Sequence, residues 1–345
     1  MTWPATPYRA DIVVPCYNEE DALPETAPVI VDFFTGLVAD PGCGLGAFRL
    51  ILINDGSQDA TWSIISELAQ RYPEIEGVML SRNFGHQNAM LAGLSVADAD
   101  VVLTMDADLQ DDIAAVKAML AAYEAGSDLA LGVRSDRTTD SAGKQGAANA
   151  YYRLLSLLGV RIIRNHADFR LMSRPALDAL LSYREVNLFL RGLIPTLGFS
   201  VALVPYARKP RLQGETKYTL RKMIRLAVDG VTSFSIMPLR LIALLGAAIF
   251  AGTMIAALYF LWVTFAHSAD VVPGWASTAL PMLFLGGMQL LSIGILGEYV
   301  GKIYLETKRR PRFIIHKTTS DAPPPDGRDM ISVNPPSASV PARSR

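Results

Sequence analysis

The sequence predicts an α/β domain followed by an amphipathic helix and two transmembrane helices. Up to Arg134, short apolar runs alternate with helical segments, a pattern typical of a mostly parallel sheet with helices on both faces. Nearer the C-terminus, two long stretches carry no charged side chain. Each exceeds the roughly 18 to 20 residues that a helix needs to cross a bilayer. These two observations together define the predicted fold class.

The expected strands are short apolar runs that end in polar turns. In chain order they cover residues 11–16, 48–53, 77–81, 101–105 and 129–133. The first three intervening helices are expected to end near Ala39, Arg71 and Ala97, and carboxylates at Asp111 and Asp112 suit the first turn of the fourth. Beyond Arg134 the alternation breaks. There the pattern predicts helices at 147–158, 176–181 and 188–197, and strands at 168–173 and 201–206.

The charge-free stretches run from Leu241 to Phe265 and from Trp275 to Leu296. Basic residues lie before the first stretch and after the second. Because positive side chains favour the cytoplasmic side, we expect both flanks and the N-terminal domain in the cytoplasm. Two buried helices of a soluble core are the alternative, and the matching basic flanks count against it.

A basic amphipathic helix is expected just before the first membrane stretch. Its apolar residues at 220, 223, 224, 227, 228 and 231 form one stripe, and Arg221, Lys222 and Arg225 lie off that stripe. This position favours a helix in the membrane interface over an ordinary core-facing helix. Four domains are therefore predicted. They are the α/β domain at 1–216, the juxtamembrane helix at 217–238, the two membrane helices at 239–305 and a tail at 306–345. The tail is rich in Pro and Ser and is expected to be disordered after about residue 318.

The composition excludes several classes of protein. Charges nearly cancel, with 32 basic and 33 acidic residues among 345, so no general attraction to nucleic acid is expected. The two cysteines, Cys16 and Cys43, lack metal-type spacing and indicate no disulfide framework, which fits a reducing compartment. The N-terminus lacks the long apolar segment of a cleaved signal peptide.

The segment from Asp106 to Gln110, Asp-Ala-Asp-Leu-Gln, follows the strand expected at 101–105. In open α/β sheets, ligands bind beyond the carboxyl ends of the strands. Oxygen ligands of this kind suit Mg²⁺, which usually takes one or two carboxylates and completes its shell with water and substrate phosphates. Two aspartates at a strand end are also common turn formers, so the pair alone leaves both interpretations open.

Other strand ends carry side chains suited to a nucleotide. Tyr17 offers a ring for packing, and Glu19 and Asp55 offer polar contacts. Arginines are suited to phosphates, and the candidates are Arg134, Arg170 and Arg211. Each of these residues alone is more often structural. Their joint placement at neighbouring strand ends favours a nucleotide site.

Six motifs together resemble family 2 glycosyltransferases. They are I-V-V-P-C-Y-N-E-E at 12–20, I-N-D-G-S at 53–57, R-N-F-G-H-Q at 82–87, D-A-D-L-Q at 106–110, D-F-R at 168–170 and R-x-x-G-E-T-K-Y at 211–218. The set is more narrowly similar to the polyprenyl-phosphate glycosyltransferases, the group of dolichol-phosphate mannose synthase and bacterial bactoprenol glucosyltransferases. The resemblance covers roughly residues 10 to 312. Thr216 stands where the family often has Ser, and the hydroxyl is kept.

The resemblance implies a GT-A fold and a role for each matching position. The residues implied to contact the nucleotide donor are Pro15, Tyr17, Glu19, Asp55, Asp106 and Arg134. Asp108 and Gln110 would ligate Mg²⁺ or Mn²⁺, and Arg211 and Lys217 would bind the acceptor phosphate. Asp168 stands where bacterial members place a proposed catalytic aspartate, with Arg170 beside it.

The implied reaction is the inverting transfer of a hexose from a nucleotide sugar to polyprenyl (undecaprenyl) phosphate at the cytoplasmic face of the membrane. The acceptor is already an anion at pH 7, since phosphate monoesters have a second pKa of about 6. Asp168 is therefore either a base or an orienting group for Arg170 or the sugar. Histidines also titrate near neutral pH. His86 is expected to be structural in its turn, and His166 is a weak candidate.

UDP-glucose is the expected donor, with GDP-mannose and UDP-N-acetylhexosamines as alternatives. A processive polysaccharide synthase is disfavoured because no Q-x-x-R-W motif and no further spans are found. A transport or flippase subunit with a regulatory nucleotide-binding domain is the alternative from another class. Glycines would let membrane helices approach closely, which favours a homo-oligomer; they are Gly246, Gly252, Gly286, Gly287 and Gly294.

Overall fold

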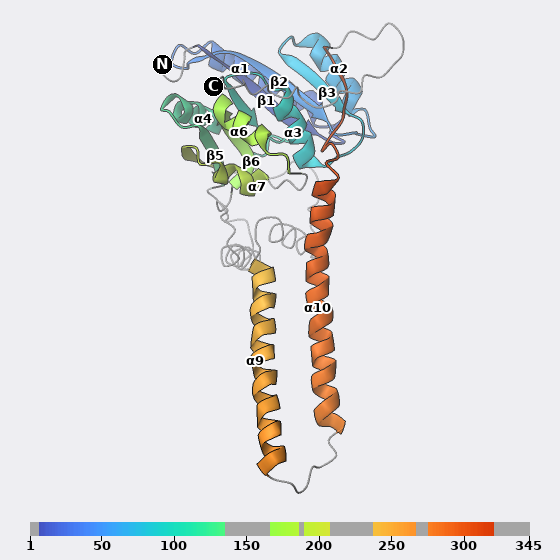
Figure 1. Ribbon diagram of the computed structural model, residues 1–345. Helices are drawn as coiled ribbons and strands as arrows, with labels where there is room; N and C mark the ends of the chain where they lie inside the picture. The colour runs from blue at the N-terminus through green and yellow to red at the C-terminus, as the bar shows by residue number, and fades with distance from the viewer. Residues whose placement is uncertain (1–6, 135–165, 186–189, 208–236, 267–274, 321–345) are drawn as a thin grey trace, which may run out of the picture. The chain divides into compact units, whose positions relative to one another are not determined.

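The computed structural model describes residues 7–134, 166–185, 190–207, 237–266 and 275–320 (Figure 1). These residues form two compact units. The first contains the sheet, its flanking helices and the segment from Arg310 onward, and the second contains the two long helices before it.

The first unit is built on a mixed sheet in the order β7-β5-β6-β4-β1-β2-β3-β8. Parallel pairs join β1 to β2 and β4, β2 to β3, and β5 to β7. The strands are β1 (Tyr8–Cys16), β2 (Leu45–Asn54), β3 (Ile75–Leu80), β4 (Val101–Thr104), β5 (Leu129–Arg134), β6 (His166–Ser173), β7 (Val201–Tyr206) and β8 (Ile315–Thr318). Those expected at residues 11–16, 48–53, 77–81, 101–105, 129–133, 168–173 and 201–206 are all found, with ends that differ by a few residues.

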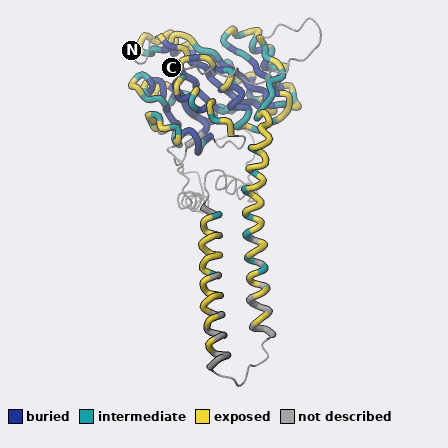
Figure 2. Tube along the Cα trace, in the orientation of Figure 1, coloured by how far each residue is buried: buried dark blue, intermediate teal, exposed yellow. Residues whose placement is uncertain are grey.

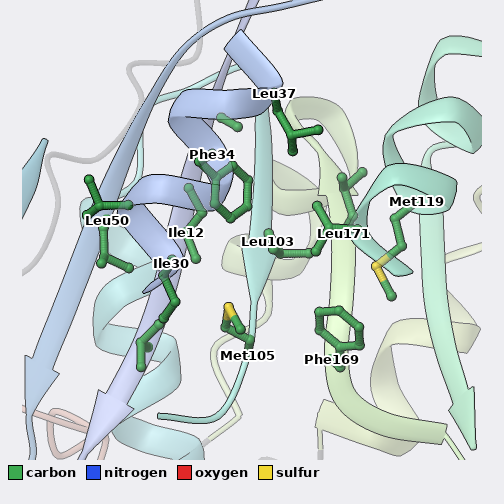
Figure 3. Packing of buried hydrophobic residues seen from close by; sticks show 14 of the residues in the cluster. Ile12, Ile30, Phe34, Leu37, Leu50, Leu103, Met105, Met119, Phe169 and Leu171 are labelled. Carbon is green, nitrogen blue, oxygen red and sulfur yellow. The ribbon is translucent and has the colours of Figure 1, made fainter. Parts of the chain in front are cut away.

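Helices cover both faces of this sheet. The helices α1 (Leu23–Val38), α2 (Thr61–Arg71) and α4 (Ala115–Glu124) contribute to a core with Ile12, Leu50, Leu103 and Leu171 (Figure 3). On the other face, Gly93 of α3 (His86–Val96) packs so closely on Val13 and Ile53 that an added Cβ would lie 2.4 Å from Val13. The remaining helices of this unit are α6 (Arg174–Ser182), α7 (Leu190–Leu193) and the 3₁₀ turn η1 (Ile194–Leu197).

Two strands run against the direction that the alternating pattern predicted. β6 is antiparallel to both β4 and β5, and β8 is antiparallel to β3. The expectation of a mostly parallel sheet is therefore corrected to a mixed one. β8 was not foreseen, because four residues in a polar segment carry too little periodicity to indicate a strand. Its place in the sheet follows from backbone pairing and from Thr319, which exchanges two hydrogen bonds with Gly77.

The second unit contains α9 (Met237–Ala266) and α10 (Trp275–Thr307), which include both predicted membrane stretches. Their described side chains are largely exposed, whereas the sheet is buried (Figure 2). Among the described residues, one segment, Phe284–Thr307, is long and apolar enough to cross a bilayer, and Leu239–Ile249 is a shorter apolar helix. The helix predicted at 147–158, residues 217–236 of the predicted juxtamembrane helix and the tail beyond Ser320 lie outside the described residues.

Candidate active site

The turn after β4 carries the predicted metal ligands. Leu109 has a left-handed backbone (φ 48°), and Asp108 Oδ1 accepts a hydrogen bond of 3.2 Å from the backbone N–H of Gln110. The side chain of Asp106 is 36% exposed, Asp108 is half-buried and Gln110 is buried. The described residues hold no group of three or more His, Cys, Asp or Glu placed for a metal. Hard oxygen donors on one turn nevertheless suit Mg²⁺ or Mn²⁺, which substrate phosphate oxygens help to coordinate.

β6 brings a second set of charged residues to the same edge of the sheet. Because β6 is antiparallel to β4 and pairs Thr104 with Arg170, its first half lies at the carboxyl end of β4. Phe169 and Leu171 enter the core (Figure 3). Because side chains alternate along a strand, Asp168 and Arg170 face the opposite side of the sheet. The reversed strand thus places Asp168 beyond the end of β4, where the turn with Asp106 begins.

Asp168 is the centre of an ion cluster. Its carboxylate is buried and accepts from Arg170 Nη2 at 2.6 Å, from Arg191 Nη2 at 2.7 Å and from Arg191 Nε at 3.3 Å. His86 Nε2 lies 3.6 Å from Asp168 Oδ2. Burial alone would raise the pKa of Asp168, but Arg170, His86 and Arg191 together hold it well below the usual range. Asp168 therefore stays ionised in this site at neutral pH.

Arg170 is a fully buried cation. Its Nε donates to Thr104 Oγ1 at 3.3 Å, and its Nη2 contacts both Asp168 and the sulfur of Met90. Its Nη1 is buried and finds no hydrogen-bond partner among the residues that the structure describes. Burial lowers the pKa of Arg170, and the neighbouring Asp168 opposes that shift. A guanidinium so enclosed fixes the position of Asp168.

His86 stands at the first turn of α3, after Gly85, whose φ of 91° is accessible chiefly to glycine. Its Nε2 lies 3.6 Å from Asp106 Oδ1 as well as from Asp168 Oδ2. Burial opposes its protonation, yet the two carboxylates raise the pKa of His86. The sequence indicated only a structural role in this turn, but the structure brings the imidazole between two of the predicted site residues.

The ends of β1 and β2 form a second part of the site. Pro15 is buried in β1, Tyr17 is 44% exposed and Glu19 is half-buried. Asp55 is buried and accepts from the backbone N–H groups of Phe84 at 2.7 Å and Gly85 at 3.0 Å, and burial raises its pKa despite these bonds. Asp55 therefore orders the turn that precedes His86, a contact that sequence analysis did not foresee.

Arg134 lies at the end of β5. Its Nε donates to the Tyr206 hydroxyl at 3.3 Å, and that hydroxyl donates to Asp111 Oδ1 at 2.6 Å. Arg134 Nη2 is 3.8 Å from the same carboxylate. The structure thus gives Arg134 two protein partners beside its predicted phosphate role. Arg211, Lys217 and the side chain of His166 lie outside what the structure describes.

Arg191 is the site residue that sequence analysis missed. It lies in an apolar segment, Leu190–Leu193, where a single arginine carries no recognisable spacing signal. Its proximity to Asp168 depends on how α7 packs. Leu190 and Leu193 are buried, and the backbone N–H of Leu190 donates to the side chain of Gln87 at 3.3 Å. These contacts fix α7 beside the start of α3.

Comparison with known proteins identifies relatives over most of the chain. Glycosyl transferase family 2 matches residues 11–181. An uncharacterized glycosyltransferase of Bacillus subtilis, YkoT, is 42% identical over 307 residues, 88% of this chain and 90% of that protein. A prophage bactoprenol glucosyl transferase homolog of Escherichia coli is 37% identical over 314 residues, 90% of this chain and 99% of that protein.

A solved mannosyltransferase of Pyrobaculum calidifontis, PcManGT in complex with GDP-Man and Mn²⁺, aligns over 86% of this chain and 89% of that chain with 16% identity and a TM-score of 0.41. The sequence relatives match nearly the whole chain, and the family match covers the segments that carry Asp55, Asp106 and Asp168. The chain is a glycosyltransferase with a GT-A-like mixed sheet and belongs to glycosyl transferase family 2.

Proposed function

We propose that this enzyme transfers a hexose, with glucose from UDP-glucose as the first choice, to polyprenyl phosphate, with inversion at the anomeric carbon. The observation that carries the proposal is the extent of the match to a relative named as a bactoprenol glucosyl transferase homolog. An alignment over 90% of this chain must include α9 and α10 as well as the sheet. The similarity to this relative therefore covers the two long helices that would contact lipid as well as the residues of the candidate active site.

In the proposed reaction, an oxygen of the lipid phosphate attacks the anomeric carbon. A new C–O bond forms as the bond to the nucleoside diphosphate breaks, and the electron pair leaves with the diphosphate. Asp108 and Gln110 would hold a divalent ion, which would act as a Lewis acid toward the departing diphosphate. Arg134 and Asp106 would contact the donor, and Arg211 and Lys217 would bind the acceptor phosphate.

Asp168 is better suited to orienting groups than to removing a proton. Its carboxylate accepts three hydrogen bonds from arginines, and its pKa is held well below the usual range, so its basicity is low. The acceptor needs little help, because a phosphate monoester with a second pKa of about 6 is largely deprotonated at pH 7. We therefore assign Asp168 to positioning in the proposed mechanism.

The proposed acceptor requires the enzyme to work at a membrane surface. We assign α9 and α10 to two crossings of the cytoplasmic membrane, with the N-terminal unit and the C-terminus in the cytoplasm. Helix α10 contains the apolar segment Phe284–Thr307, and α9 carries no charge from Leu241 to its end. The basic segment before α9 would bind anionic head groups, and close glycine contacts would support a homo-oligomer.

The direct test uses the full chain in nanodiscs with Mg²⁺ and undecaprenyl phosphate. UDP-glucose, GDP-mannose and UDP-N-acetylglucosamine are supplied in separate reactions, and both nucleotide release and the sugar–lipid product are measured. Undecaprenol without phosphate is the matched control, and chelation by EDTA is expected to stop transfer until Mg²⁺ or Mn²⁺ is restored. Formation of a glucosyl lipid from UDP-glucose supports the proposal. The absence of any sugar–lipid product with all three donors contradicts it.

A further inference from the structure

We infer that Arg191 binds a substrate phosphate and that Asp168 orients it for this contact. The inference rests on the proposed function, because it assigns a residue to the phosphates of that reaction. Its basis is the unequal burial of the two arginines that share the Asp168 carboxylate.

The two arginines have different environments. Arg170 has no exposed side-chain surface and is held by Thr104 and Met90 inside the unit. The side chain of Arg191 is 43% exposed, although its Nε and Nη2 are both within hydrogen-bond distance of Asp168. Arg170 alone would neutralise the buried carboxylate. Arg191 therefore presents a positive charge at the accessible side of the Asp168–Arg170 pair.

The attachment of Arg191 also favours a ligand role. A bidentate contact with a carboxylate fixes the plane of a guanidinium, and a guanidinium with a fixed plane loses less freedom when it binds a phosphate. The helix that carries it is short but anchored by the buried side chains of Leu190 and Leu193. His86 lies between Asp168 and Asp106, so the same carboxylate also neighbours the turn that carries the predicted metal ligands.

Two sources of phosphate are compatible with this position, namely the diphosphate of the donor and the monophosphate of the lipid. They share the same chemistry toward a guanidinium. A purely structural role is the competing explanation, in which Arg191 only neutralises Asp168. In that case the removal of Arg191 would alter folding or turnover without changing the affinity for either phosphate.

The experiment compares Arg191→Gln, Arg191→Lys and Arg174→Gln in the full chain. Arg174 is the matched control because it also pairs with an aspartate, Asp178, and is 30% exposed, but lies on α6 outside the site. Two constants are measured: the KM for undecaprenyl phosphate, and the Kd for UDP in the presence of Mg²⁺. Thermal unfolding of each variant reports folding, and Arg191→Lys provides the test if Arg191→Gln does not fold.

Arg191→Gln is expected to raise one of these two constants at least about tenfold, because it removes a charge-assisted hydrogen bond. A rise in the KM identifies the lipid phosphate, and a rise in the Kd identifies the donor diphosphate. Arg191→Lys is expected to show a smaller rise, since lysine keeps the charge but not the planar contact. Arg174→Gln should leave both constants within about twofold of the wild type.

The inference is overturned if both constants stay within twofold of the wild type in the folded Arg191 variants. That result would leave Arg191 as a structural partner of Asp168. Failure of the proposed function has a different signature, because the wild-type chain itself would then form no sugar–lipid product.

Discussion

Asp168→Asn provides a quantitative test of the ion cluster. The substitution keeps the shape of the side chain but removes the negative charge that faces a fully buried Arg170. Breaking a buried ion pair from one side typically costs 3 to 5 kcal/mol, because the remaining charge is left uncompensated. The asparagine oxygen still accepts a hydrogen bond, so we expect the lower end, about 3 kcal/mol. A domain of this size loses about 2 to 4 °C in Tm per kcal/mol, which gives roughly 6 to 12 °C.

The assay is thermal unfolding of the full chain in detergent, followed by tryptophan fluorescence, since Trp62 belongs to the same unit as Asp168. Asp178→Asn is the matched control. Its partner Arg174 lies one helical turn away at the surface, and such i, i+4 pairs contribute about 0.3 to 0.5 kcal/mol. The control should therefore lower Tm by no more than about 2 °C. Equal shifts in the two variants would refute the assignment of Asp168 as the counter-charge of a buried cation.

Three further predictions follow from the same residues. Because the folded-state pKa of Asp168 lies below its unfolded value of about 3.9, its stabilisation is lost as pH falls through the folded pKa, so the Tm gap between wild type and Asp168→Asn should narrow below about pH 4. Asp168 also raises the pKa of His86, which adds stability when the imidazole is protonated, so the Tm gap should be wider near pH 5 than near pH 8; a gap that is independent of pH would contradict both contacts. Gly56→Ala should destabilise the fold by about 2 kcal/mol or more, since the φ of Gly56 is +66° and an added Cβ would lie 2.4 Å from the backbone of the next turn. Gly36→Ala, on the open surface of α1, should instead stabilise the fold by about 0.5 to 1 kcal/mol. Urea unfolding measures both free energies, and equal effects would contradict the predicted backbone strain at Gly56. The third substitution neutralises the basic side of the predicted juxtamembrane helix, at Arg221, Lys222 and Arg225. It should raise the KM for undecaprenyl phosphate in vesicles with anionic lipid and leave UDP binding unchanged. An unaltered KM would refute the interfacial role of this helix.

Local patterns were sufficient to predict most of the first unit. Its buried strands are continuous apolar runs with polar exits, and its helices begin where these exits end. The direction of β6 could not be predicted in the same way. Residues 168–173 have the same apolar character whether the strand runs parallel or antiparallel, and direction depends on the path of the preceding chain. The sequence pattern therefore predicts a strand here but not its orientation.

The candidate site was predictable where residues stand in one turn and not where they meet through packing. Asp106, Asp108 and Gln110 are neighbours in sequence, so their proximity follows from a single strand end. Arg191 and Asp168 are 23 positions apart and meet only because α7 packs at the start of β6. No periodicity in either segment encodes that contact. Such residues become visible only when the packing of the helix is known.

The antiparallel direction of β6 explains how one strand can both pack in the core and hold charged residues of the candidate site. In a parallel strand, the residues at the carboxyl end of the sheet come last, and a following turn must supply the polar side chains. In β6 they come first, so Asp168 and Arg170 are held within the regular strand, with Phe169 between them anchored in the core. A charged pair built into a strand is more rigid than one on a loop. This rigidity lets Asp168 hold the more exposed Arg191 in a fixed plane, so the site gains an oriented cation without a long ordered loop.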